Sequence, residues 1–148
     1  MRASLKLLLL TLALALTSNI AWASVGRILI FEGDVKVNGE PVTTETRLNI
    51  EDSVSTGEDS TVTIVLADNS VLDLESNSEV SISEYYYDAS ASEQNTSQID
   101  VLAGTLRYVS GKIAKDDPEN VSFSAGTSTI GVRGTFISIS VCPDEGCD

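Results

Sequence analysis

Apolar and polar residues alternate with a period of two along most of the chain after residue 23. The alternating segments lie at residues 35–37, 62–66, 72–74, 80–82, 99–101, 106–108, 121–125 and 137–141. They are short, and Gly, Asn, Asp or Ser residues separate them, which is typical of β-strands joined by tight turns. No segment after residue 23 keeps a helical period over three turns. We therefore predict an all-β fold of many short antiparallel strands, arranged as a two-layer sandwich or a β-solenoid-like roll.

The segments between the expected strands carry turn and loop signals. Asn38-Gly39 follows an alternating pair of valines and predicts a tight hairpin. Residues 88–98 contain no large apolar side chain, and we expect them to form an exposed loop. Residues 116–120 are acidic and include Pro118, which argues against a central strand there.

The first 23 residues have the pattern of a secretory leader. Arg2 and Lys6 precede an uninterrupted apolar run at residues 7–16, and Ala21-Trp22-Ala23 fits the small-x-small pattern of a signal peptidase site. The run is too short for a transmembrane helix, which needs about 20 residues. We expect residues 1–23 to be a signal peptide, with an uncleaved membrane anchor as the alternative. The domain would then span residues 24–141, and residues 142–148 would form a C-terminal tail.

The negative charge of the chain excludes some classes of binding partner. The full sequence has a formal net charge of −13 and contains no histidine. After removal of residues 1–23, seven basic and 22 acidic residues remain, so the net charge becomes −15. Such a surface repels nucleic acids and anionic lipids, and we expect neither nucleic-acid binding nor membrane insertion of the processed chain. The absence of histidine excludes Ser-His-Asp and Cys-His catalysis and histidine metal ligands.

The two cysteines, Cys142 and Cys147, lie near the C-terminus. In an oxidising compartment such a pair most often forms a disulfide, which here would close a short loop and fasten one end of the chain. A metal pair or a redox pair is the alternative. The acidic residues contain no D-x-D-x-D-G calcium loop. We expect no catalytic residues, metal ligands or cofactor.

Three side chains are candidates for a binding surface. In a strand, Tyr85 and Tyr87 would lie on one face, with Tyr86 on the other. An exposed tyrosine pair could stack on a sugar or on a protein, but we favour the alternative that these rings cover the rim of the core. Arg133 lies between Gly131 and Gly134 and could contact a ligand. We favour the structural alternative, in which Arg133 pairs with a neighbouring carboxylate at a tight bend where the glycines allow close backbone approach.

A set of short motifs in a fixed order resembles the FecR-like periplasmic domain family. The motifs are Gly33-Asp34-Val35, Thr56-Gly57-Glu58-Asp59-Ser60, Leu72-Asp73-Leu74, Asn77-Ser78-Glu79-Val80-Ser81-Ile82, Leu102-Ala103-Gly104-Thr105-Leu106 and Gly131-Val132-Arg133-Gly134-Thr135. Together they extend over about residues 25–141. The resemblance implies an all-β module outside the cytoplasm that receives a signal in regulators of this type. Those regulators also have a cytoplasmic anti-sigma segment and a membrane helix, in place of which this sequence has the expected leader.

These observations favour a non-catalytic module that is exported to the periplasm or secreted. We expect it to bind an envelope protein or a glycan, with signal sensing as one role for that binding. The alternative is a structural or surface-associated component that assembles with copies of itself or takes part in adhesion.

Overall fold

The computed structural model describes residues 24–142, which form twelve strands and three short helices. The strands are β1 (Gly26–Glu32), β2 (Val35–Val37), β3 (Glu40–Pro41), β4 (Arg47–Leu48), β5 (Ser53–Thr56), β6 (Thr61–Leu66), β7 (Val71–Leu74), β8 (Glu79–Tyr86), β9 (Thr96–Val109), β10 (Val121–Ala125), β11 (Ser128–Gly131) and β12 (Phe136–Val141). The helical segments are η1 (Ser92–Gln94), α2 (Lys112–Asp116) and η2 (Pro118–Asn120). No helix among the described residues is long and apolar enough to cross a membrane. The all-β prediction is confirmed.

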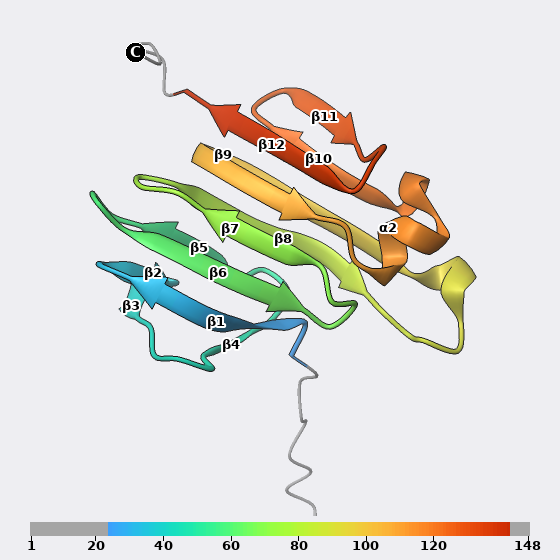
Figure 1. Ribbon diagram of the computed structural model, residues 1–148, viewed down its shortest axis with the longest axis horizontal. Coiled ribbons are helices and arrows are strands. Elements are labelled where there is room, and N and C mark those ends of the chain that lie inside the picture. The colour runs from blue at the N-terminus through green and yellow to red at the C-terminus, as the bar shows by residue number, and fades with distance from the viewer. Residues whose placement is uncertain (1–23, 143–148) are drawn as a thin grey trace, which may run out of the picture.

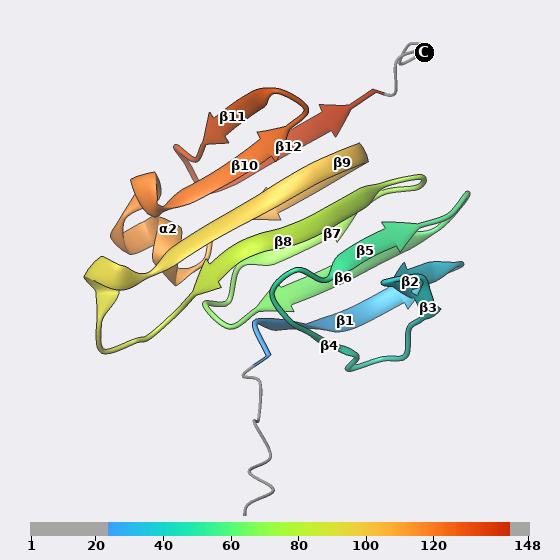
Figure 2. The ribbon, with the colours of Figure 1, turned by 180° about the vertical axis from the view of Figure 1, so that it is seen from behind.

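The strands form two layers that share one long strand (Figures 1 and 2). Sheet I has the order β4-β1-β6-β7-β9-β12. Sheet II has the order β3-β2-β5-β8-β9-β10-β11. Neighbouring strands are antiparallel except β9 and β10, which are parallel. The fold is therefore a curled, partly open sandwich, which combines features of both predicted arrangements.

Strand β9 joins the layers because it bends in the middle. Its first part, as far as Ala103, pairs with β8 in sheet II, and its last part, from Leu106, pairs with β7 in sheet I. Gly104 lies at the bend with φ +74°, a conformation that glycine adopts without steric cost. A Cβ atom there would lie 2.3 Å from the Ser78 hydroxyl oxygen and 2.6 Å from the Asn77 carbonyl oxygen. The sequence pattern predicted two strands here, and the structure corrects this to one strand of 14 residues.

The alternating residues of both sheets point into one core. Inward side chains such as Ile64 in β6, Leu72 in β7, Ile99 in β9 and Phe123 in β10 are completely buried. Tyr108 and Phe123 meet edge to face, with their ring centroids 5.0 Å apart. The period-two pattern of the sequence thus marks the inner and outer faces of each sheet.

The predicted turns are found, and one loop is shorter than expected. Asn38 and Gly39 both have positive φ, and they connect β2 and β3 as a hairpin. The expected loop at residues 88–98 ends at Asn95, because β9 begins at Thr96. Asn95 is buried, and its side-chain amide bonds to the backbone of Asp88, so the end of this loop is packed against the fold.

Candidate interaction surface

Most of the family-like motifs form the bends at which the chain passes from one sheet to the other, whereas Leu72-Asp73-Leu74 lies within β7. Within the motif at residues 56–60, the Ser60 hydroxyl accepts a hydrogen bond of 2.8 Å from the Asp34 N–H in the preceding bend. The Thr56 hydroxyl accepts a bond of 2.9 Å from the Ser78 N–H in the following bend. The Gly57 N–H donates to the Asp34 carbonyl, and the Asn77 N–H donates to the Gly57 carbonyl. These bends are therefore stacked and cross-linked, so their motifs have a structural role.

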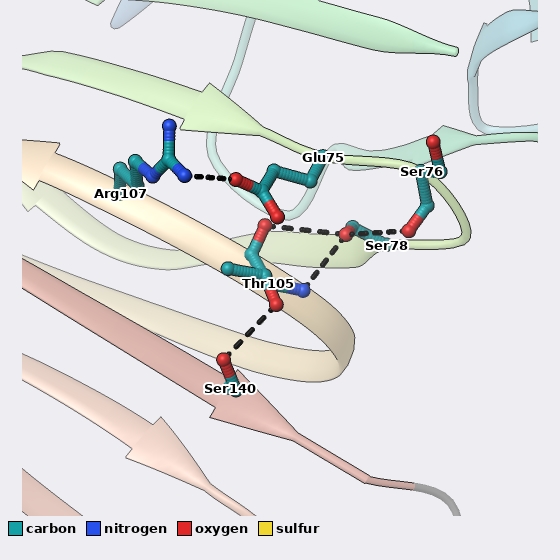
Figure 3. A network of polar contacts seen from close by, with 6 residues as sticks. All are labelled: Glu75, Ser76, Ser78, Thr105, Arg107 and Ser140. Carbon is teal, nitrogen blue, oxygen red and sulfur yellow. Dashed lines mark hydrogen bonds and ion pairs between the residues drawn. The ribbon is translucent and has the colours of Figure 1, made fainter. Parts of the chain in front are cut away.

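The last members of this stack are shown in Figure 3. The Ser78 hydroxyl accepts a bond of 2.9 Å from the Thr105 N–H, one residue after the bend in β9. The hydroxyls of Thr105 and Ser140 lie 3.0 Å apart and join β9 to β12. On the same strand, Arg107 forms an ion pair with Glu75. The network connects the stacked bends at this end of the sandwich to β12, the last strand.

The opposite end of the sandwich contains a buried carboxylate. Asp68 is only 1% exposed and lies in the turn between β6 and β7. Its Oδ1 accepts bonds from the Ser70 hydroxyl at 2.7 Å and from the Tyr85 hydroxyl at 3.1 Å. Its Oδ2 accepts a bond of 3.3 Å from the Ile113 N–H at the start of α2. A buried carboxylate needs such donors to replace its hydration, so this residue ties the turn, β8 and α2 together.

Tyr85 belongs to this buried network, which agrees with the favoured interpretation that the tyrosine rings cover the core and corrects its candidacy for an exposed binding surface. Its side chain is 6% exposed, and its hydroxyl also accepts a bond of 2.9 Å from the Asp68 N–H. Burial raises the pKa of Tyr85, and the nearby Asp68 carboxylate raises it further. Burial likewise raises the pKa of Tyr108 to about 12, and Asp68 again contributes. Tyr87 is half-buried against the core, so the two rings cover the core and do not form an exposed pair.

Arg133 is exposed, and it forms no ion pair with the residues that the structure describes. The expected pairing with a neighbouring carboxylate is therefore absent from this region. The role expected of the glycines is wrong, because a Cβ atom at Gly131 or Gly134 would have no atom within 4 Å. The loop is held instead by Val132, which is buried, and by Ser110, whose hydroxyl donates a bond of 2.7 Å to the Gly134 carbonyl.

The proposed disulfide cannot be placed in the fold. Cys142 follows β12, and Cys147 lies outside the described residues. The disulfide between them stays a prediction. Within residues 24–142, no group of three or more His, Cys, Asp or Glu side chains is arranged to hold a metal ion.

An apolar row crosses the outer face of sheet I, and we call it the valine–phenylalanine row. It consists of Val65, Val71, Val109 and Phe136, which are direct cross-strand partners on β6, β7, β9 and β12. Such partners point to the same side of a sheet. The valines are half-buried, and Phe136 is 58% exposed. Phe136, at one end of the row, comes three residues after Arg133, so the candidate binding residue Arg133 lies next to the row along the chain.

Polar side chains border the row on the same face of sheet I. The neighbouring row contains Thr63, Asp73, Arg107 and Ser138, again as direct partners on the same four strands. Thr63 donates a hydrogen bond of 2.6 Å to Asp73. An apolar strip with a polar border is typical of a protein–protein contact surface. Sequence reasoning missed this row because its members are far apart in the chain and meet only through the strand register.

Comparison with known proteins identifies one family. The family model described as FecR protein matches residues 52–146. Comparisons with curated proteins and with solved structures found no match. The matched region contains the stacked bends from residue 56 onward, the bent strand β9, the loop that carries Arg133, and β12. FecR domains are associated with signal sensing and transduction. The chain belongs to the FecR family.

Proposed function

We propose that the chain is an exported, non-catalytic FecR module that binds another envelope protein in signal sensing. Residues 1–23 would direct its export and would be removed, which leaves the processed domain in the periplasm. Family membership supports the sensing role. The valine–phenylalanine row supports binding, and it is the single observation that carries the proposal.

The row favours a protein over a glycan as the partner. The glycan interpretation depended on an exposed pair formed by Tyr85 and Tyr87, and Tyr85 is buried in the Asp68 network. The row itself offers aliphatic side chains and one exposed phenyl ring across four strands. Aliphatic surface next to hydrogen-bonding groups suits the apolar side chains of a protein partner.

Site-specific photo-crosslinking in intact cells tests this proposal. Val71, at the centre of the row, is replaced by the photoreactive amino acid p-benzoylphenylalanine. Ser81 receives the same replacement as a control, because it lies on β8 in sheet II with its side chain on the opposite outer face. We expect irradiation to join the Val71 variant, but not the Ser81 variant, to a second envelope protein. No adduct at Val71, the same adduct at both positions, or an adduct only between two copies of this chain would contradict the proposal.

A further inference from the structure

The edge strands on one side of the molecule differ in length and composition from those on the opposite side. On one side the outer strands are β3 and β4, which have two residues each and contain Pro41 and Arg47. Short strands, proline and charge all prevent an edge from pairing with another chain. On the other side lie β11 and β12 (Figure 1). They have four and six residues, and neither contains a charge or a proline.

Charge is distributed in the same asymmetric way. Residues 24–120 contain six basic and 19 acidic residues. Residues 121–142, which include β10, β11 and β12, contain Arg133 and no acidic residue. Two copies of this acidic chain repel each other in most orientations. They can approach without bringing the carboxylates of residues 24–142 together if they meet at this uncharged side.

The core is incompletely closed between β11 and β12. A groove of about 530 Å³ opens there, and Ile130, Ile137 and Ile139 are among the residues that line it. Ile130, Ile137 and Val141 are only partly buried, although they pack against the core. Apolar surface that a partner covers is removed from water, so the groove favours further pairing at this side.

The backbone groups of β12 are available for that pairing. The Ser110 N–H donates a bond of 2.9 Å to the Thr135 carbonyl, at the position just before the ladder between β9 and β12. In an antiparallel ladder, every second residue directs its N–H and C=O toward the neighbouring strand. Thr135 faces β9, so Phe136, Ser138 and Ser140 direct their N–H and C=O groups to the open edge. No described strand pairs with that edge.

We propose that β12 pairs with β12 of a second copy in an antiparallel, two-fold symmetric dimer. The segment Ile137-Ser138-Ile139-Ser140-Val141 reads the same in both directions as an apolar and serine pattern. With Ile139 on the two-fold axis, Ser138 of one copy lies opposite Ser140 of the second copy. Ile137 lies opposite Val141 of the second copy. The residues with free backbone groups then pair with one another, and the inward residues extend both cores.

Two charge variants test the interface and its register in the exported, processed chain. Ser138→Glu with Ser140→Glu places like charges opposite each other across the dimer axis. Ser138→Glu with Ser140→Lys places opposite charges there, and it changes the same two positions. Both positions lie on the outer face, and urea unfolding checks that each variant folds. The size of each protein is measured by light scattering during gel filtration, with and without a thiol reductant, so that a disulfide-linked species is recognised.

We expect the wild-type chain to be a dimer in the presence of the reductant. The Glu/Glu variant should dimerise with an affinity that is about tenfold or more weaker, and the Glu/Lys variant should remain a dimer. Salt should strengthen the wild-type dimer because it screens the repulsion between the acidic bodies. In hydrogen exchange, the Ser138 and Ser140 amides should gain protection as the protein concentration rises. A monomeric wild type, or a Glu/Glu variant that dimerises like the wild type, would overturn the proposal. Neither outcome bears on the Val71 crosslink, because Val71 lies two strands away from β12.

Discussion

Replacement of Tyr85 by phenylalanine should destabilise the fold through the loss of one hydroxyl group. The ring stays in place, so no cavity forms. The hydroxyl accepts a bond of 2.9 Å from the Asp68 N–H and donates one of 3.1 Å to the Asp68 carboxylate. Without it, the N–H of a residue that is 1% exposed loses its partner, and the carboxylate loses one of its donors.

The magnitude follows from these two bonds. A buried donor without a partner costs about 1–3 kcal/mol, and a hydrogen bond to a charged group contributes about 1.5–3 kcal/mol. Ser70 and the N-terminus of α2 still donate to the carboxylate, which limits the second loss. We expect the Tyr85→Phe variant to lose about 2–4 kcal/mol of unfolding free energy, measured by urea denaturation followed by circular dichroism.

Tyr86→Phe is the matched control for this measurement. Tyr86 is the next residue on β8, it is 46% exposed, and its hydroxyl makes no hydrogen bond with the described residues. We expect this variant to change the unfolding free energy by less than about 0.5 kcal/mol, as is usual for surface substitutions. Equal effects of the two variants would refute the role assigned to Asp68. A Tyr85→Phe variant that keeps the stability of the wild type but no longer binds the partner would also refute this role, because that result would identify Tyr85 as a contact residue.

Three further predictions concern the bend, the buried tyrosines and the surface. Gly104→Ala should prevent folding or lower the unfolding free energy by several kcal/mol, because the added Cβ would overlap Ser78. Gly126 also has a positive φ, but a Cβ there would have no atom within 4 Å, so Gly126→Ala should lower the unfolding free energy by only about 1–2 kcal/mol in the same urea assay. The pKa of Tyr108 is raised to about 12, so the unfolded chain ionises first and the unfolding free energy should fall between about pH 10 and pH 12. Tyr108 alone contributes about 2 kcal/mol to this fall and Tyr85, whose pKa is also raised, adds to it, so stability unchanged up to pH 12 would contradict this. Arg107→Ala should lower the unfolding free energy by at most about 1 kcal/mol because its ion pair is exposed, and a loss above 2 kcal/mol would show that the pair has a larger role.

The sequence predicted those parts of the fold that depend on local chemistry. The alternation at residues 62–66 and 137–141 marks real strands, and Asn38-Gly39 makes the expected hairpin. It did not predict that β9 is one strand, because the glycine at its centre reads as a strand break. That glycine is required where the strand crosses between layers, and only the position of Ser78 in space shows why.

The site was harder to predict because it depends on contacts between distant residues. Tyr85 was a candidate for the binding surface, since nothing local in the sequence indicates that its hydroxyl reaches Asp68, 17 positions earlier. Arg133 was expected to pair with one of the many carboxylates, yet it forms no ion pair with those that the structure describes. The valine–phenylalanine row exists only through the register of four strands. The absence of charge from the last strands could have been read directly from the sequence.

The most direct test of the proposed function uses the envelope protein joined to Val71 by photo-crosslinking. Its affinity for the purified FecR module is measured by isothermal titration calorimetry, with Val71→Glu compared with Ser81→Glu. The two variants add the same charge to opposite outer faces, so the overall electrostatic change is matched. We expect Val71→Glu to weaken binding by about 100-fold, as for a residue at the centre of an interface, and Ser81→Glu to change it by less than about threefold. Equal affinities of the two variants would contradict the assignment of the valine–phenylalanine row as the binding surface.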